Sequence, residues 1–341
     1  MTPLKEQARE WLGPLYEPLR AYFWSVASIQ QRISVFWLFT AILTATALYL
    51  YRDRKAHPFT WRGLRAYLFP IHVFAHPSAV GDYKLFVVNK AVFLFGLGAL
   101  AVSADSVQAY VHTLLRDELG AAPWTVSAGM GVHLAFALAS LLAYEVGYFW
   151  AHYLGHKVPV LWEFHKLHHS AEVLTPFTSY REHPVDILIQ FSVQGTLMGA
   201  VAAGFTWAFP GAEVATVWGI NVVYLPFHWI ANLRHSHIWL AFGPRLSRVL
   251  SSPAQHQIHH SSAPQHRDVN FANMFAFLDH FAGTLYVAPK DPEPIVLGIG
   301  AVTQPFPSLT KMYLAPFAGA AGRIVQWYAK PQGGGDVADD A

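Results

Sequence analysis

Long apolar runs alternate with shorter polar segments along most of this chain. Five of these runs are long enough to enter or cross a bilayer, because a spanning helix needs about 20 apolar residues. They cover residues 33–51, 85–104, 129–150, 187–209 and 212–230. The second run contains Lys90 and is the weakest of the five. The pattern predicts an all-α integral membrane protein with four to five transmembrane or re-entrant helices.

The loops between the runs differ in charge, which predicts the orientation of the helices. Residues 52–65 hold five basic side chains against one acid, Asp53, whereas residues 105–128 hold three acids against Arg116. The first loop is therefore expected on the cytoplasmic side and the second outside. A Pro210-Gly211 turn between the last two runs predicts a tight antiparallel helical hairpin. With these crossings, both histidine-rich segments, 152–186 and 232–290, fall on the cytoplasmic side as a helical cap.

Composition agrees with a multi-pass membrane protein. Apolar residues make up 53% of the chain and charged residues 13%, and the mean hydropathy is +0.27. Soluble domains usually carry about 25% charged residues. The net charge of +2 predicts no nucleic-acid partner. The absence of cysteine excludes disulfides, thiolate zinc sites and cysteine-bound iron–sulfur clusters on this chain, and the charged N-terminus predicts no cleavable signal peptide.

The chain has 19 histidines, and most of the informative ones fall into three clusters. The clusters have the spacings H-x-x-x-H, H-x-x-H-H and again H-x-x-H-H. Their members are His152 and His156; His165, His168 and His169; and His256, His259 and His260. On a helix, residues three or four apart share one face, so each cluster can present several imidazoles together. Eight imidazoles exceed the needs of one ion and suit a dinuclear site of zinc, copper, iron or nickel.

Acidic residues near these clusters are candidates for a supporting or catalytic role. Glu145 lies seven residues before His152, on the same helix face and about 10 Å deeper. A carboxylate inside an apolar run is a functional candidate, with a ligand histidine or a tyrosine as its expected partner and a local packing contact as the alternative. Five acids close to the clusters could accept the second N–H of a ligand histidine. They are Glu163, Glu172, Glu182, Asp268 and Asp279.

The remaining histidines carry weaker signals. Seven of them are expected to be ordinary surface or packing residues: His57, His72, His76, His112, His133, His266 and His280. For His228 and His237 the sequence leaves a ligand role open.

At these clusters, HYLGH (152–156), HKLHH (165–169) and HQIHH (256–260), the sequence resembles the fatty acid hydroxylase/sterol desaturase superfamily of membrane di-iron enzymes. PFTSYREHPVD (176–186) and HSH (235–237) are also similar to family segments and add His183 and His235 as expected metal ligands. DVNFAN (268–273) and LDHFAGTLY (278–286) resemble its closing stretches. Tyr153 and Ala282 depart from common family residues, which affects the subfamily and not the chemistry.

The resemblance implies two iron ions bound by these ten histidines, with O₂ as co-substrate and Glu145 as a candidate catalytic residue. It implies hydroxylation or desaturation of a C–H bond in a membrane lipid, fatty acyl chain or sterol. Electrons would come from a separate donor, such as a ferredoxin, a cytochrome b5-like protein or a reductase, because the chain shows no flavin or cysteine motif of its own. A metal transporter and a b-type haem electron carrier are the alternatives.

These features divide the chain into five predicted parts. Residues 1–32 form an amphipathic N-terminal segment and residues 33–128 an N-terminal transmembrane region. Residues 129–290 form a catalytic domain similar to the superfamily, residues 291–329 are a C-terminal extension, and the Gly-rich acidic tail 330–341 is disordered.

Overall fold

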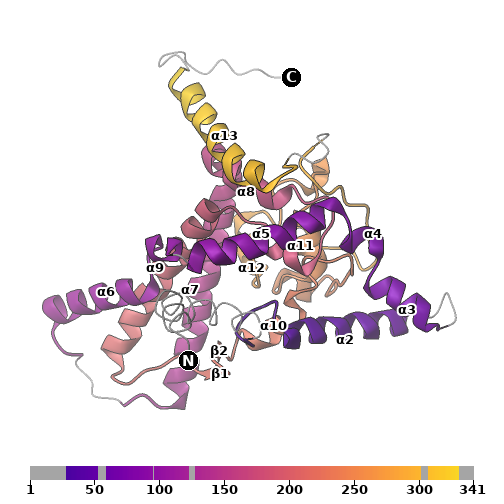
Figure 1. Ribbon diagram of the computed structural model, residues 1–341. Helices are drawn as coiled ribbons and strands as arrows, with labels where there is room; N and C mark the ends of the chain where they lie inside the picture. Colours follow the sequence, from indigo (N-terminus) through magenta and orange to yellow (C-terminus); the bar gives the residue numbers. More distant parts are fainter. Residues whose placement is uncertain (1–27, 53–58, 95, 123–126, 301–305, 330–341) are drawn as a thin grey trace, which may run out of the picture.

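The computed structural model describes residues 28–52, 59–94, 96–122, 127–300 and 306–329, so the predictions for residues 1–27 and 330–341 lie outside it. The described chain is mostly helical (Figure 1). Two long helices, α7 (Met130–Lys157) and α9 (Pro184–Ala208), pack side by side at its centre. The histidine-bearing segments gather beside the end of α7, and α13 (Leu309–Ala329) extends beyond them.

The described residues of the N-terminal half form five α-helices and one 3₁₀ helix. They are α2 (Val35–Arg52), α3 (Trp61–Leu68), α4 (Ile71–Phe74), α5 (Pro77–Leu94), η2 (Leu97–Leu100) and α6 (Ala104–Leu119). The first apolar run is thus one helix, as predicted. The second run is interrupted, because Gly96 adopts φ 105° between α5 and η2, and the helices on either side form a pair bent by 66°.

The second half consists of short elements that follow the two long helices. They are α8 (Pro159–His169), η3 (Pro176–Tyr180), β1 (Thr216–Val217), β2 (Ile220–Asn221), α10 (Leu225–Ala231), η4 (Leu246–Arg248), α11 (Pro253–His259), η5 (Pro264–His266) and α12 (Phe277–Ala282).

The predicted spanning helix at 212–230 is wrong, and with it the helical hairpin around Pro210-Gly211. Strands β1 and β2 pair antiparallel through a turn in which Trp218 and Gly219 have φ 54° and 75°. Two positive φ angles in a two-residue turn are typical of a β-hairpin and cannot continue a helix. The helix that follows, α10, has only 7 residues and is too short to cross a bilayer.

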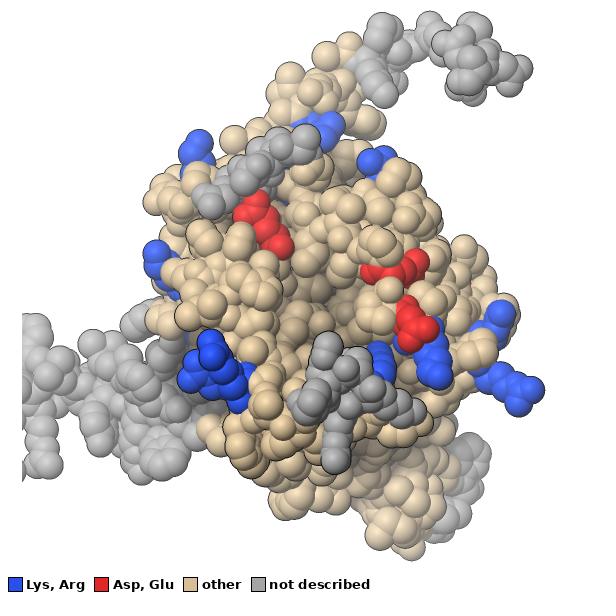
Figure 2. Space-filling view, turned by 90° about the vertical axis from the view of Figure 1, so that its right-hand side faces the viewer, with Lys and Arg blue, Asp and Glu red and all other residues tan. Residues whose placement is uncertain are grey.

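Three described helices are long and apolar enough to cross a membrane: α2, α7 and α9. The bent pair formed by α5 and the helices up to Leu119 would make four if it counts as one span. Outward-facing apolar side chains on α2, such as Val35 and Phe39, are 77% and 55% exposed, which fits contact with lipid. Figure 2 shows a face of the molecule on which charged side chains are few and separated by wide uncharged areas.

Small residues let the long helices approach closely. A Cβ atom at Gly147 of α7 would lie 2.8 Å from the Cα of Gln194 in α9. On the other side of α9, Cβ atoms at Gly195 and Gly199 would collide with backbone carbonyl oxygens of Val102 and Ala104 at the start of α6. Close approach at small residues is the usual packing mode of helices in membranes. The contact at Gly147 sets how closely α7, which carries His152 and His156 near its end, packs on α9.

Candidate metal centre

Local chain geometry brings the first two histidine clusters together. His152 and His156 lie on the last turns of α7, which ends at Lys157. Val158 takes an extended conformation (φ −96°, ψ 113°), and Pro159 starts α8 at once. Proline is well suited to the first turn of a helix, where its missing N–H costs no hydrogen bond. The reversal at Val158 returns His165, His168 and His169 towards α7.

The third cluster lies on α11, which has a well-defined start. Ser252 and Gln255 form a reciprocal capping box, and Pro253 occupies the first turn. His256 and His259 lie within this helix, and His260 is its C-terminal cap. The H-x-x-H-H clusters therefore do occupy helices, as their spacing predicts.

Nine of the ten sequence-predicted ligands converge in two groups. In each group, one ligand atom from every member lies within 4.8 Å of the others. The first group contains His152, His156, His165, His169 and His259, and the second contains His168, His235, His256 and His260. All of them are buried except His156, which is partly exposed. The groups are adjacent, since the rings of His169 and His260 stack with centroids 4.8 Å apart.

Hydrogen bonds fix the proton position on three rings of the first group. His152 Nδ1 lies 2.7 Å from the carbonyl oxygen of Phe271, His259 Nδ1 lies 2.7 Å from that of Val269, and His165 Nδ1 lies 2.8 Å from a carboxylate oxygen of Asp186. These oxygens only accept, so each Nδ1 must carry the proton and donate it. Each Nε2 is then a lone-pair acceptor, and all three are buried without a hydrogen-bond partner in the described structure.

In the second group the Nε2 atoms of the histidines also converge, but other residues contact the Nδ1 atoms. His235 Nε2 lies 3.0 Å from His256 Nε2, 3.0 Å from His260 Nε2 and 3.3 Å from His168 Nε2. Nitrogens that bind one ion at about 2.0–2.1 Å are separated by roughly 3 Å, so this spacing suits a shared metal. Ser179 Oγ lies 2.9 Å from His235 Nδ1, whereas Arg234 donates to His256 Nδ1 at 2.9 Å.

The ring nitrogens of the two groups are better satisfied by a metal ion than by hydrogen bonds to one another. Buried nitrogen lone pairs that face a common centre without donors are unfavourable, because an unsatisfied buried acceptor costs about 1–3 kcal/mol. A cation at each centre would satisfy them together, and neutral imidazole is a common ligand of zinc, copper and iron.

The electrostatics of the groups keep the imidazoles neutral. Burial lowers the pKa of His168, His169, His235, His256, His259 and His260 well below the usual 6.5, and charge on neighbouring groups lowers it further. Lone pairs therefore remain available to a metal at neutral pH. Asp268 contacts His156 Nδ1 at 3.3 Å and Lys157 Nζ at 2.6 Å, and these partners hold the pKa of the Asp268 carboxyl below its usual range.

Residues 271–275 form a backbone strap that supports a ring in each group. The carbonyl of Phe271 holds His152, and the carbonyls of Ala272 and Asn273 accept hydrogen bonds from Arg234, the donor to His256. The strap is itself anchored by two buried carboxylates. Asp279 accepts from the backbone N–H groups of Phe271 and Ala272 at 2.7 and 2.9 Å.

Glu145 is the second anchor of the strap, and this differs from its expected place beside a ligand. Its carboxylate accepts from Asn273 Nδ2 at 2.8 Å and from the backbone N–H groups of Met274 and Phe275 at 2.6 and 3.2 Å. No histidine or tyrosine hydrogen-bonds to it in the described structure. Glu145 therefore supports the histidines through the strap, and its assignment as a catalytic residue stays a prediction.

His183 is the one predicted ligand that the structure places apart from both groups. Its Nδ1 accepts from the backbone N–H of Val185 at the start of α9, and its Nε2 lies 3.1 Å from the carbonyl oxygen of Tyr313 in α13. Both ring nitrogens are thus occupied by helix contacts. His237 likewise contacts the carbonyl oxygen of Tyr67, and His228 packs between Trp37 and Tyr224.

Of the five acids expected to support a ligand, Asp268 contacts a histidine of the two groups in the described part of the chain. Asp268 contacts His156, whereas Glu163 pairs with Lys166 and Arg323, and Asp279 anchors the strap. Asp186, the partner of His165, was not among the five. Its place three residues after His183 in the first turn of α9 offered no sequence signal that would separate it from a helix-capping acid.

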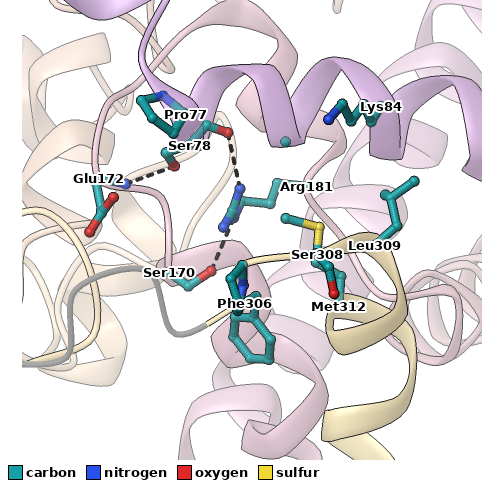
Figure 3. Close-up of a pocket in the computed structure, with 12 residues that line it drawn as sticks. Pro77, Ser78, Lys84, Ser170, Glu172, Arg181, Phe306, Ser308, Leu309 and Met312 are labelled. Carbon is teal, nitrogen blue, oxygen red and sulfur yellow. Dashed lines mark hydrogen bonds between the residues drawn. The ribbon is translucent and has the colours of Figure 1, made fainter.

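Arg181 fixes the end of α8 next to His168 and His169. Its Nε donates to the carbonyl oxygen of Leu167 and to Ser170 Oγ, both at 3.0 Å. Its Nη1 pairs with Asp82 of α5 at 2.6 Å. Figure 3 shows the contacts of Arg181 with the carbonyl oxygen of Ser78 and with Ser170. A cavity of about 90 Å³ lies beside this guanidinium.

A larger cavity borders the first group directly. It has a volume of about 280 Å³, and its wall includes His156, His169, His259 and His260. Its wall also includes Trp162, Ile299 and two exposed polar residues, Arg267 and Asp268. The histidine groups therefore border open space on this side.

Comparison with known proteins agrees with this arrangement. Residues 137–284 match the model of a family described as fatty acid hydroxylase. The chain is 27% identical over 168 residues to an alkylglycerol monooxygenase of Danio rerio, covering 47% of this chain and 32% of the relative. It is 30% identical over 170 residues to an ornithine lipid hydroxylase of Rhizobium tropici, covering 49% and 46%. A Delta(7)-sterol 5(6)-desaturase of Aspergillus fumigatus is 25% identical over 183 residues, covering 50% and 51%.

The chain thus spans between 32% and 51% of the length of these relatives. No solved structure matches it. The matched residues contain all nine histidines of the two groups and both anchors of the strap. By this match and by its curated relatives, residues 137–284 of the chain are similar to the fatty acid hydroxylase/sterol desaturase superfamily.

Proposed function

We propose that this protein is a membrane oxidoreductase that uses O₂ and two iron ions to hydroxylate a C–H bond of a lipid. The observation that carries the proposal is the convergence of nine imidazoles in two adjacent groups, with three buried Nε2 lone pairs left without a partner. The relatives named as a monooxygenase and a hydroxylase favour oxygen insertion. The relative named as a desaturase makes desaturation the second candidate.

In this proposal, His152, His156, His165, His169 and His259 would hold one ion, and His168, His235, His256 and His260 the other. Such ions supply the reduction of O₂ and the abstraction of hydrogen from an unactivated C–H bond. The chain supplies the geometry: Phe271, Val269 and Asp186 hold three rings in the tautomer that a metal needs. We do not include His183 among the ligands, because both of its nitrogens are occupied.

The membrane helices and an external electron donor complete the proposal. Helices α2, α7 and α9 would let an apolar lipid reach the histidine groups from the bilayer. Hydroxylation by O₂ consumes two electrons and two protons and releases one water, so a separate donor is required. We place the site on the cytoplasmic side, from the charge of the loops. A transporter or haem carrier is not favoured, because the histidines cluster at helix ends within an oxidoreductase family.

The direct test is an assay of the iron-loaded protein in liposomes with a chemical or protein electron donor. We expect O₂ consumption with lipid products heavier by one oxygen, and desaturation would instead remove two hydrogens. His152→Ala and His168→Ala, one from each group, should each lose at least about 100-fold in rate, in line with the loss of a metal ligand or its support. Iron content should fall in both variants.

His280→Ala is the matched control, since His280 is an exposed histidine outside both groups. It should keep full rate and iron content. Full activity of the His168→Ala protein, or activity of the wild-type protein without iron, would overturn the proposal.

A further inference from the structure

Arg32 connects to the second histidine group through a short hydrogen-bonded path. Its Nη2 donates to Ser179 Oγ at 3.2 Å, and that oxygen lies 2.9 Å from His235 Nδ1. No carboxylate lies within ion-pair distance of this guanidinium in the described part of the chain. Arg32 therefore places a positive charge, with no carboxylate partner among the described residues, two hydrogen bonds away from His235 of the proposed metal centre.

Tyrosines surround the same guanidinium. Tyr144 and Tyr148 of α7, Tyr180 of η3 and Tyr224 all lie close enough to interact with it electrostatically. The ring of Tyr148 packs edge-on against His152, with centroids 5.3 Å apart. In the described structure the hydroxyls of Tyr144 and Tyr148 have no hydrogen-bond partner. The side chains of Tyr144, Tyr148 and Arg32 are each only partly buried.

The nearby acids leave this charge uncompensated. Glu182 interacts electrostatically with Arg32 but makes no ion pair with it in the described part of the chain. Glu145 lies instead beside Arg234, a second buried arginine in the same region. A buried cation without a counter-ion is unfavourable, whereas an arriving anion would be bound strongly.

We propose that Arg32, with the hydroxyls of Tyr144 and Tyr148, binds an anionic oxygen group, a phosphate or a carboxylate, on the polar head of the lipid substrate. This inference rests on the proposed function and narrows it. Because the head would be held beside His235 and His152, the oxidised carbon lies among the first few carbons after the head and not far along the acyl chain.

Binding can be measured without turnover, on iron-loaded protein in a non-ionic detergent with no electron donor. The probes are dodecyl phosphate, dodecanoate and dodecanol, which share a chain and differ in the head. We expect at least one anionic probe to bind roughly tenfold or more tightly than dodecanol, the effect of one charge-assisted contact. The tighter of the two anions identifies phosphate or carboxylate as the preferred group.

Arg32→Gln should remove the preference for the anions and leave dodecanol binding unchanged, and Arg32→Lys should keep part of it. Tyr148→Phe gives a second, milder test, with a several-fold loss for the anions alone. Arg245→Gln, at an exposed arginine, is the matched control. Equal binding of all three probes by the wild-type protein would overturn the inference even if every variant failed to fold.

The two proposals fail separately. If the wild-type protein binds the anions but oxidises no lipid, the proposed function is wrong and the binding site stands. If it oxidises a lipid far from its head, as mass-spectrometric fragmentation of the product would show, the head-group inference is wrong and the proposed function stands.

Discussion

At the scale of single residues, the candidate centre depends on partners that the sequence does not reveal. The spacing of the histidines predicted which rings would gather. It could not predict that backbone carbonyls of Phe271 and Val269 fix the tautomers of His152 and His259, because every residue has a carbonyl. The sequence singles out Glu145 because it is an acid within an apolar run. Only the fold shows that its partners are the backbone N–H groups of Met274 and Phe275.

Glu145 gives a direct test of this support. Glu145→Gln replaces one acceptor oxygen with an NH₂ group that would face donors of the strap. We expect the free energy of unfolding to fall by about 1–3 kcal/mol, which is the usual cost of an unsatisfied buried donor. Iron content should fall as well, because the strap holds His152 and, through Arg234, His256. Thermal unfolding in detergent and metal analysis measure the two effects.

Glu118→Gln is the control, since Glu118 is exposed on α6 and should tolerate the change. Unchanged stability and unchanged iron in the Glu145→Gln protein would show that the strap does not need its second carboxylate.

At the scale of elements, apolar runs predicted helices well where the run was uninterrupted. The runs at 33–51, 129–150 and 187–209 correspond to α2, α7 and α9. The run at 212–230 failed because hydropathy does not distinguish a helix from a β-hairpin of similar composition. The Trp218-Gly219 turn, with two positive φ angles, decides between them, and a tryptophan in that conformation has no clear sequence signature.

The close approach of α9 and α6 can be tested by a substitution at their contact. Gly199→Ala should destabilise the protein by about 1–3 kcal/mol, the range for overpacking, because the new methyl group would meet the Val107 side chain at 2.7 Å and the Ala104 carbonyl. Thermal unfolding in detergent measures the change. Gly204→Ala in the same helix is the control: a Cβ atom there meets nothing within 4 Å, and alanine favours a helix.

If the two alanine variants unfold at the same temperature, the close approach of α6 and α9 is not what positions these helices.

At the scale of the whole molecule, the sequence predicted the helical class, the membrane character and all nine histidines that converge in the two groups. It misplaced His183, because motif similarity does not show that α13 approaches and occupies its ring through Tyr313. It also gave no indication of Arg234 and Arg181, two buried arginines that connect distant segments. Such contacts depend on tertiary proximity, which local spacing does not encode.

The buried histidines predict how stability depends on pH. Their folded-state pKa values lie below the unfolded value of 6.5, so the unfolded chain takes up more protons as the pH falls. The free energy of unfolding of the iron-free protein should therefore be highest above about pH 6.5 and fall progressively below that pH. Iron competes with protons for the same nitrogens, so the loaded protein should decline only at lower pH.

Thermal unfolding of both forms between about pH 5 and pH 8 measures this dependence. Equal stability of the iron-free protein at the two ends of the range would contradict the burial of neutral imidazoles.

The strap at residues 271–275 has a further consequence. It touches a ring of one group directly and a ring of the other through Arg234, while Asp279 and Glu145 hold it from two sides. A shift at one histidine group is thereby transmitted to its neighbour through a single piece of backbone. The two groups form one mechanical unit, and a disturbance that loosens either of them loosens the pair.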